Sequence, residues 1–226
     1  MKDTLVENPK EAGALVIRHI AVLDQAEAVR EEVERILWDA MVNSVETWAS
    51  KAGWDVNFSE LHDDRGRWIA DQRWRAPPDK DSGPAAYFSL ERAGSPAAYW
   101  LTSFCGASSD RVGFRWEVNV SAIAAGRKPA AAWKRLAQTL HDAEAALTRR
   151  GFELERENGS WFLPFRLDAE ALVEAYLKDD FETALIPLRD ALHGLEDTVE
   201  LFTQILDRAR VELPGASSTP LSTVGR

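Results

Sequence analysis

The feature that most constrains this chain is a run of apolar residues near its C-terminal end, whose spacing alternates between four and three without a slip. The run consists of Phe181, Leu185, Leu188, Leu192, Leu195, Val199, Phe202, Leu206 and Ala209. This 3.5-residue repeat places all members on one side of an α-helix and is the spacing of a coiled-coil seam. We therefore expect a long helix from about Asp180 to Leu213, which begins or kinks near Pro187 because proline lacks the amide that an interior turn needs.

Two interpretations of this seam are open. In the first, a homodimer or docking interface forms around Leu185, Leu192, Val199 and Leu206. In the second, the seam packs on the core of its own chain. Coiled coils usually place Glu or Lys at the flanking positions, but one flanking row here consists of Ala184, Ala191, Thr198 and Ile205. An uncharged row widens the apolar stripe, as in a helix of a globular protein, and favours the second interpretation.

The chain before this helix predicts an α+β fold. Apolar residues recur every three or four positions from Val29 to Trp48, which predicts a long N-terminal helix over about residues 25–51, with Asp24 as N-cap and Gly53 as the stop. Short alternating runs between turn residues then predict an antiparallel meander. Its five candidate strands are Trp54–Glu60, Trp68–Arg75, Ala85–Arg92, Ala97–Cys105 and Val112–Val120.

Three further segments complete the expected architecture. The segment Glu11–Leu23 fits either a short helix or a strand. A middle helix is expected from Pro129 to Arg150, because proline suits the first turn of a helix. A terminal hairpin is expected from Phe152–Glu157 and Ser160–Leu167, joined by the two-residue turn Asn158-Gly159. The prediction is an antiparallel sheet of about five to seven strands packed against a long N-terminal, a middle and a long C-terminal helix.

The composition is that of a single folded domain. With 226 residues, 45% hydrophobic and 28% charged, the chain resembles an ordinary globular protein. We expect one domain over residues 1–212 and a disordered tail over residues 213–226, which are rich in Ser, Thr, Gly and Pro. The first residues lack the apolar stretch of a secretory signal, and the single Cys105 cannot form an internal disulfide. We therefore expect a cytoplasmic protein with no membrane partner.

The formal charge of −10 is concentrated in the helical segment 168–212, where twelve acidic residues oppose four basic ones. Such a surface repels phosphate backbones and attracts basic proteins. We predict a non-catalytic interaction or regulatory protein that binds a basic protein partner through this segment, with a nucleic-acid mimic as one version. The predicted partner-binding residues are Asp190, Glu196, Asp197, Glu200 and Asp207.

An enzyme is the alternative, although the chain lacks the common phosphate-binding, zinc-hydrolase and serine-hydrolase motifs. The candidate is a divalent-metal-dependent nuclease or hydrolase, with Mg²⁺ bound by carboxylates on predicted strands, namely Asp71, Glu91 and Glu117. The triplet that begins at Glu117 has asparagine at position 119, where such nuclease sites carry lysine. Magnesium as cofactor and nucleic acid as partner are expected only under this alternative, and no other metal site is predicted.

Three weaker candidates remain. Trp68 and Trp74 would share one face of a predicted strand, with Arg73 on the other face, and form a ligand groove of aromatic and cationic side chains. His62-Asp63-Asp64 and the pair His141 and Glu144 carry metal-binding groups, but such residues also suit turns and helix surfaces. The alternation around Cys105 predicts a buried or half-buried strand thiol rather than a nucleophile.

Overall fold

One antiparallel sheet forms the centre of the protein. The computed structural model describes residues 9–58, 67–76, 83–94, 99–124, 129–143 and 145–213. The sheet has six strands in the order β1-β2-β3-β4-β6-β5. The strands are β1 (Trp54–Asn57), β2 (Trp68–Asp71), β3 (Ala86–Ala93), β4 (Arg111–Val118), β5 (Glu153–Glu155) and β6 (Ser160–Phe165).

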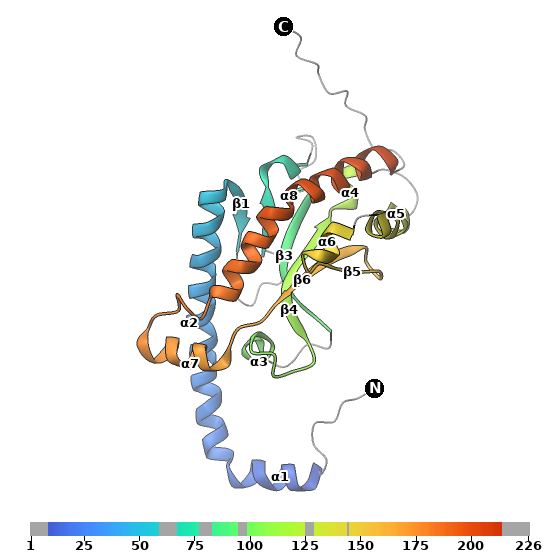
Figure 1. Ribbon diagram of the computed structural model, residues 1–226. Helices are drawn as coiled ribbons and strands as arrows, with labels where there is room; N and C mark the ends of the chain where they lie inside the picture. The colour runs from blue at the N-terminus through green and yellow to red at the C-terminus, as the bar shows by residue number, and fades with distance from the viewer. Residues whose placement is uncertain are drawn as a thin grey trace.

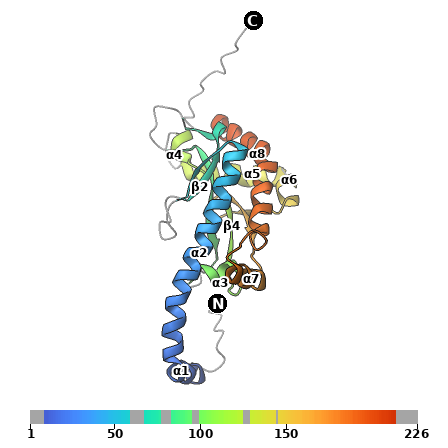
Figure 2. The ribbon, with the colours of Figure 1, turned by 90° about the vertical axis from the view of Figure 1, so that its left-hand side faces the viewer.

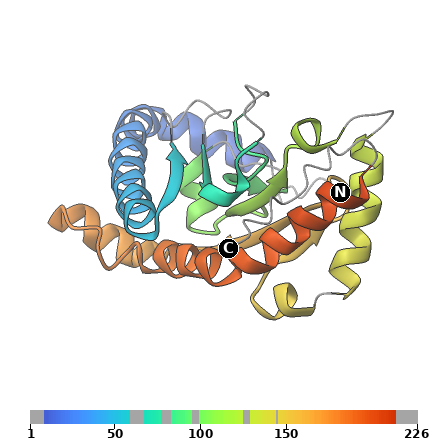
Figure 3. The ribbon, with the colours of Figure 1, turned by 90° about the horizontal axis from the view of Figure 1, so that it is seen from above.

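Helices lie along one face and both edges of this sheet. They are α1 (Pro9–Arg18), α2 (Ile20–Ala52), the 3₁₀-helix η1 (Gln72–Trp74), α3 (Trp100–Phe104), α4 (Val120–Ile123), α5 (Pro129–Ala143), α6 (Ala145–Arg149), α7 (Ala169–Lys178) and α8 (Ile186–Glu212). Helix α8 crosses one face of the sheet, α2 lies beside β1, and α5 lies beyond the opposite edge (Figures 1 and 3). The predicted α+β architecture is confirmed.

Helix α8 packs its apolar seam on the sheet. Its aromatic centre is Phe202, whose ring lies 4.6 Å from that of Trp116 and 5.3 Å from that of Phe88. The predicted uncharged row is buried as well, at Ala184, Ala191, Thr198 and Ile205. The broad stripe packs on its own chain, which confirms the second interpretation of the seam. Leu185, Leu192 and Leu206 are buried in this packing and Val199 contacts the same core, so the protein's own chain covers the surface that the first interpretation assigns to a dimer.

The N-terminal helix is longer than its sequence pattern predicts. It begins at Ile20 and not after Asp24, and the segment before it is helical too, with a break at His19 between α1 and α2. Aspartate is compatible with a helix interior, so Asp24 did not mark a boundary. The predicted stop is confirmed, since Gly53 caps α2 in the left-handed conformation with φ of 73°. Residues 9–33, which comprise α1 and the outer part of α2, project beyond the sheet and are called the arm (Figure 2).

Two predicted strands differ from the structure because side-chain contacts bend the chain locally. One of them is not a strand, and the other is shorter than predicted. The segment Ala97–Cys105 contains helix α3 instead of a strand, and the rings of Trp100 and Phe104, one turn apart, are in contact with centroids 5.5 Å apart. Cys105 is therefore not a strand thiol, although it is half-buried, and burial raises the pKa of its thiol. Strand β2 ends at Asp71, whose carboxylate accepts a hydrogen bond from the Arg73 amide at 2.8 Å and starts η1.

The predicted terminal hairpin forms, but its turn differs. Glu155 pairs with Ser160, so the loop has four residues, and of these only Gly159 has a positive φ, of 78°. A two-residue Asn-Gly turn needs positive φ at both positions. Asn158 instead accepts hydrogen bonds from the amide and the hydroxyl of Ser160, at 3.2 and 2.6 Å. The wider loop is thus closed by the asparagine side chain.

The buried apolar residues form one continuous core that includes Trp48, Phe88, Trp116 and Phe202. Leu213, the last described residue, is buried at its edge, and the remainder of the predicted tail lies outside the described residues. Among the described helices, none has the length and apolar character that would let it cross a membrane.

Candidate functional site

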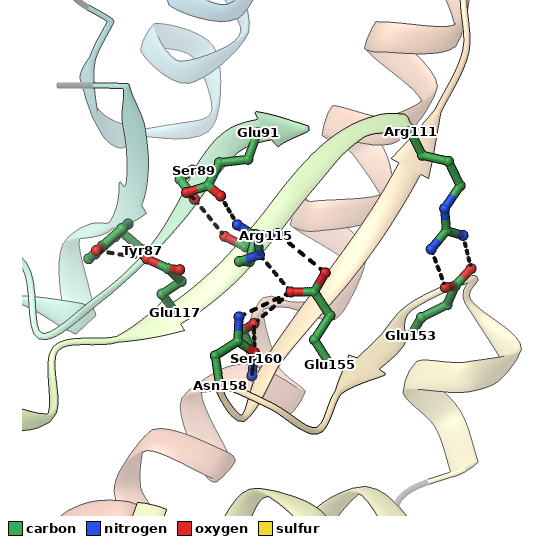
Figure 4. A network of polar contacts seen from close by, with 10 residues as sticks. All are labelled: Tyr87, Ser89, Glu91, Arg111, Arg115, Glu117, Glu153, Glu155, Asn158 and Ser160. Atoms are coloured by element: carbon green, nitrogen blue, oxygen red, sulfur yellow. Dashed lines mark hydrogen bonds and ion pairs between the residues drawn. The ribbon is translucent and has the colours of Figure 1, made fainter. Parts of the chain in front are cut away.

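The three predicted metal-binding carboxylates lie on two different faces of the sheet. Glu91 and Glu117 project from the face opposite α8 (Figure 4). Asp71 lies at the end of β2 and pairs with Arg73, whose guanidinium also binds Glu200 of α8 at 2.6 Å. The structure therefore brings Glu91 and Glu117 onto one face but does not bring Asp71 to them.

Arg115 occupies the centre of the face that carries the two glutamates. Its guanidinium forms ion pairs with Glu91 and, at 2.7 Å, with Glu155 of the neighbouring hairpin. Glu117 accepts a hydrogen bond of 2.9 Å from the hydroxyl of Tyr87. Within the described part of the chain, no three His, Cys, Asp or Glu side chains are grouped so as to hold a metal ion. A protein cation thus already pairs with the carboxylates nearest to the expected site.

The ionisation of this network follows from its contacts. Burial of Glu155 tends to raise its pKa, but the hydrogen bond and charge of Arg115, with bonds from Asn158 and Ser160, outweigh burial and lower it. Burial raises the pKa of Tyr87, and the adjacent Glu117 raises it further, so this phenol stays protonated. Each of the three glutamates in this network, Glu91, Glu117 and Glu155, is therefore bound by a neighbouring arginine or tyrosine side chain.

An aromatic ring lies beneath the arginines of this face. Phe162 is fully buried, with the guanidinium carbons of Arg111 and Arg115 at 5.5 and 5.8 Å from its ring centroid. Arg111 is itself held by two hydrogen bonds to Glu153, at 2.7 and 2.8 Å. Gly113 leaves room for the ring, since a Cβ there would lie 2.7 Å from Phe162 Cζ. The arginines therefore cover apolar surface on the face that α8 leaves open.

The predicted ligand groove is not assembled. Trp74 is fully buried in the core, where its Nε1 donates to Thr203 Oγ1 at 2.9 Å. Arg73 lies at the surface, paired with Asp71 and Glu200. Trp68 is half-buried on β2 and pairs with Ser89 on β3. The two tryptophans do not share a strand face, because β2 ends at Asp71 and Trp74 belongs to η1.

A different group of aromatic and cationic side chains lies between α2 and α3, at the inner end of the arm. The sequence pattern did not indicate it. The guanidinium of Arg67 is 5.3 Å from the ring of Trp38 and 4.9 Å from that of Trp100, and Arg92 is 4.5 Å from Trp100. Trp38 and Arg67 are buried, so this cluster joins α2 to α3 rather than lining an open groove.

A buried carboxylate fixes the same junction. Glu34 is 7% exposed and accepts hydrogen bonds from the Leu101 amide at 3.0 Å and from Arg30 at 2.6 Å. The Arg30 guanidinium also lies 4.1 Å from the ring of Tyr99. The N-cap residue of α3 provides no side-chain bond, so Glu34 satisfies one of its free amides from another helix.

A hollow of about 440 Å³ lies between the α3–β4 loop and the end of β6. Asp110, which is buried, accepts hydrogen bonds from the hydroxyls of Ser103, at 2.6 Å, and Ser108. Arg166 at the rim crosses Gly106, where a Cβ would lie 2.7 Å from its Nε. Both hydroxyls donate to the same carboxylate, and the residues that line the hollow include no histidine or lysine, the bases that usually activate a serine.

The two other histidine-based candidates gain no support. His62-Asp63-Asp64 and Glu144 lie outside the described residues. His141 Nδ1 accepts a hydrogen bond of 3.3 Å from Trp161 Nε1, which fixes the histidine against the core.

The predicted acidic surface is exposed, but arginines partly neutralise it. Asp190, Glu196, Asp197, Glu200 and Asp207 all lie on the outward side of α8. Arg150, Arg73 and Arg210 form ion pairs with three of them, at 3.0, 2.6 and 3.1 Å respectively. Two of these arginines come from outside the acidic segment, so its sequence alone gave no sign of them.

Carboxylates that have no ion-pair partner among the described residues are concentrated where α7 meets α8. We call residues 169–190 the elbow. Its exposed apolar side chains are Val173, Tyr176, Leu177 and Ile186. Its carboxylates that form no ion pair with a described residue are Glu170, Asp179, Asp180, Glu182 and Asp190. No protein family, curated protein or solved structure matches this chain, so a function has to be inferred from surfaces such as this one.

Proposed function

We propose that this protein is a non-catalytic interaction protein that binds a basic protein partner at the elbow. The observation that carries the proposal is the combination of exposed apolar side chains with carboxylates that lack an arginine partner in the described chain. Exposed apolar patches with a polar rim are typical of protein-interaction surfaces.

The geometry of α7 supplies the apolar part of the surface. Val173, Tyr176 and Leu177 are three and four residues apart, so they share one side of α7, while Leu172 and Ala175 are buried on the other side. Leu177 is 77% exposed, and because Val173 and Tyr176 beside it are exposed as well, the three form a patch rather than one isolated apolar side chain. A partner that buries these side chains would gain hydrophobic energy there.

The charges around this row determine the kind of partner. Asp179, Asp180 and Glu182 follow directly after it and are all exposed. Carboxylates at the rim speed the encounter with a basic surface and reject an acidic one. We therefore propose a partner segment that combines lysine or arginine with apolar side chains, such as a basic amphipathic helix.

A nucleic-acid mimic is less well supported than a protein partner. A mimic requires regularly presented negative charge, but Asp197, Glu200 and Asp207 on α8 each have an arginine beside them. An apolar row is also not part of a phosphate-like surface. The nuclease alternative receives no support from the sheet carboxylates, because Arg115 is bound between Glu91 and Glu155.

Site-specific photo-crosslinking in the cells that naturally produce the protein tests the elbow. A benzophenone amino acid replaces Leu177 in the full chain, and the control chain carries it at Gln204, an exposed position on α8. We expect a discrete adduct with a basic protein only from position 177. The absence of an adduct at 177, or the same adducts from both positions, would contradict the proposal.

Charge reversal then tests the nature of the contact. Asp180→Lys with Glu182→Lys reverses the charge of two of the five unpaired carboxylates, next to the exposed apolar row, and we expect this change to abolish the adduct. Asp207→Lys with Glu212→Lys changes the net charge equally, but at carboxylates that are already paired with Arg210 and Arg208. This matched pair should leave the adduct intact. Equal loss in both variants would show that only net charge matters.

A further inference from the structure

The loop between β5 and β6 contains Asn158-Gly159, the one place in the chain where a glycine follows an asparagine. Asparagine is a thermolabile residue, because the amide nitrogen of the next residue can attack its carboxamide carbon. Glycine has no side chain to hinder that attack. Asn158 is also exposed to the water that the reaction consumes. The loop therefore has the composition of a site that modifies itself.

In the folded hairpin, three hydrogen bonds hold the carboxamide of Asn158 (Figure 4). Its Oδ1 accepts from the amide and the hydroxyl of Ser160, at 3.2 and 2.6 Å, and its Nδ2 donates to Glu155 Oε2 at 3.2 Å. A carboxamide that is bound through both of its polar atoms cannot turn toward the Gly159 nitrogen without losing these bonds. The closed loop thus restrains the group that would be attacked.

The attacking nitrogen is engaged as well. The Gly159 amide donates to the main-chain oxygen of Glu155 at 2.8 Å, and the attack requires that this amide lose its proton. Gly159 is buried against α5, where a Cβ would lie 3.1 Å from Trp133 Nε1. A base from solvent therefore reaches the proton only after the loop has moved away from the helix.

We propose that Asn158 is a modification site that reacts when this loop opens. The Gly159 nitrogen then loses its proton to solvent and bonds to Asn158 Cγ, the Cγ–Nδ2 bond breaks, and ammonia leaves with a proton taken from water. Water next adds to one of the two carbonyl carbons of the five-membered imide and breaks the bond of that carbon to nitrogen. The product is aspartate or isoaspartate, and the sum of the steps converts an amide and water into a carboxylate and an ammonium ion.

The product does not fit the closed loop. A carboxylate oxygen takes the place of Nδ2, so two like charges meet where 3.2 Å separated Nδ2 of Asn158 from Glu155. Isoaspartate also adds a methylene to the main chain of a four-residue loop. Glu155 binds Arg115 at 2.7 Å, so the repulsion extends to the ion-pair network on the open face of the sheet. The reaction is thus a lasting record of loop opening that favours further opening.

Peptide mass spectrometry of the full chain, aged in neutral buffer and in guanidinium chloride, tests the site. We expect Asn158 to convert in the denaturant and to convert at least about tenfold more slowly in buffer, because local opening costs free energy. Asn119 is the internal control and should stay unmodified over the same period, because the β-branched Val120 that follows it hinders attack. Equal rates at Asn158 in the two solvents, or no conversion in the denaturant, would overturn the proposal.

A matched pair of variants tests the hydrogen bonds that close the loop. Ser160→Ala removes the hydroxyl that donates to Asn158 Oδ1, and the rate in buffer should rise about two- to tenfold, which corresponds to the loss of one hydrogen bond. Ser121→Ala removes the equivalent bond of 2.7 Å to Asn119 and should leave the rate at Asn158 unchanged. In guanidinium chloride both variants should react as the parent does. An unchanged rate of Ser160→Ala in buffer would show that these bonds do not protect Asn158.

Hydrogen exchange of the full chain tests the effect of the product. Asn158→Asp reproduces one product directly, and we expect several-fold faster exchange of the β5 and β6 amides than in the parent. Asn57→Asp places the same charge on an exposed asparagine of β1 and should leave these amides as protected as before. Unchanged protection in Asn158→Asp would contradict a reaction that favours further opening. No partner is needed for these measurements, so they are independent of the proposal for the elbow.

Discussion

The two long helices of this protein carry the same alternation of four and three, yet one seam is buried and the other is exposed. On α8 the row beside the seam is uncharged and buried, at Ala191, Thr198 and Ile205, so the stripe is wide enough to lie flat on a sheet. The second seam lies on α2 and includes Val22, Ala26, Val29 and Val33, of which the first three are exposed. Beside it Arg35 holds Glu32 and Asp39, at 2.6 and 3.0 Å, which keeps the stripe narrow. The width of a stripe, rather than its period, indicates what covers it.

The largest expected contrast comes from truncation of one residue in each seam. Phe202→Ala removes the ring that packs on Trp116 and Phe88, and it should lower the free energy of unfolding by about 3–5 kcal/mol. Val29→Ala on the arm should change it by less than about 0.5 kcal/mol, because the side chain is exposed. Urea unfolding followed by circular dichroism at low protein concentration measures both. Similar losses of unfolding free energy in the two variants would show that the two seams do not differ in how they are packed.

An intermediate effect is expected at the junction between arm and body. Glu34→Ala leaves the Leu101 amide and Arg30 without their shared acceptor, so we expect a loss of about 2–3 kcal/mol. Glu34→Gln keeps an oxygen for the amide and should lose about 1 kcal/mol. The control, Glu32→Ala, breaks only an exposed pair with Arg35 and should cost less than about 0.5 kcal/mol. Equal losses at positions 32 and 34 would show that the junction is not held by the buried carboxylate.

The smallest expected effect compares the glycines of the two regions. Gly194 lies within α8, and a Cβ there would make an ordinary contact of 3.4 Å with Leu163, so Gly194→Ala should raise the free energy of unfolding by about 0.5–1 kcal/mol. Gly13 lies in α1 with nothing within 4 Å of its Cβ position. Gly13→Ala should increase the helical signal while leaving the unfolding midpoint of the body unchanged. A shift of that midpoint would show that the arm unfolds together with the body.

The spacing of the apolar residues and the residues typical of turns and helix ends were sufficient to predict much of the fold. The α8 seam, the stop at Gly53 and the alternation of β4 are local properties of the chain, and the structure has all three. The strand predicted over residues 97–105 failed because alternation over a few residues does not exclude a short helix. The N-terminal helix was read as having one apolar stripe, because two rows only 100° apart look like one in a count of residues three and four apart.

The candidate sites were less predictable, because they depend on contacts between distant parts of the chain. The partner of Glu200 is Arg73, 127 residues away, and that of Asp197 is Arg150, 47 residues away. Net charge located the acidic segment but could not show which carboxylates are already paired. Likewise, Arg115 stands on the same strand as Glu117, but its role required knowledge of the register between β4 and the hairpin that carries Glu155.

The placement of the tryptophans divides the protein spectroscopically. The first of the nine is Trp38, so the arm has none, while the rings of Trp74, Trp116 and Trp161 lie about 6 Å apart in the core. Intrinsic fluorescence is therefore emitted by the body alone, and excitation absorbed by one buried indole can pass to its neighbours. Docking, fraying or proteolytic loss of the arm should leave the emission spectrum unchanged. A dye attached to the arm would accordingly report events that the native chromophores do not register.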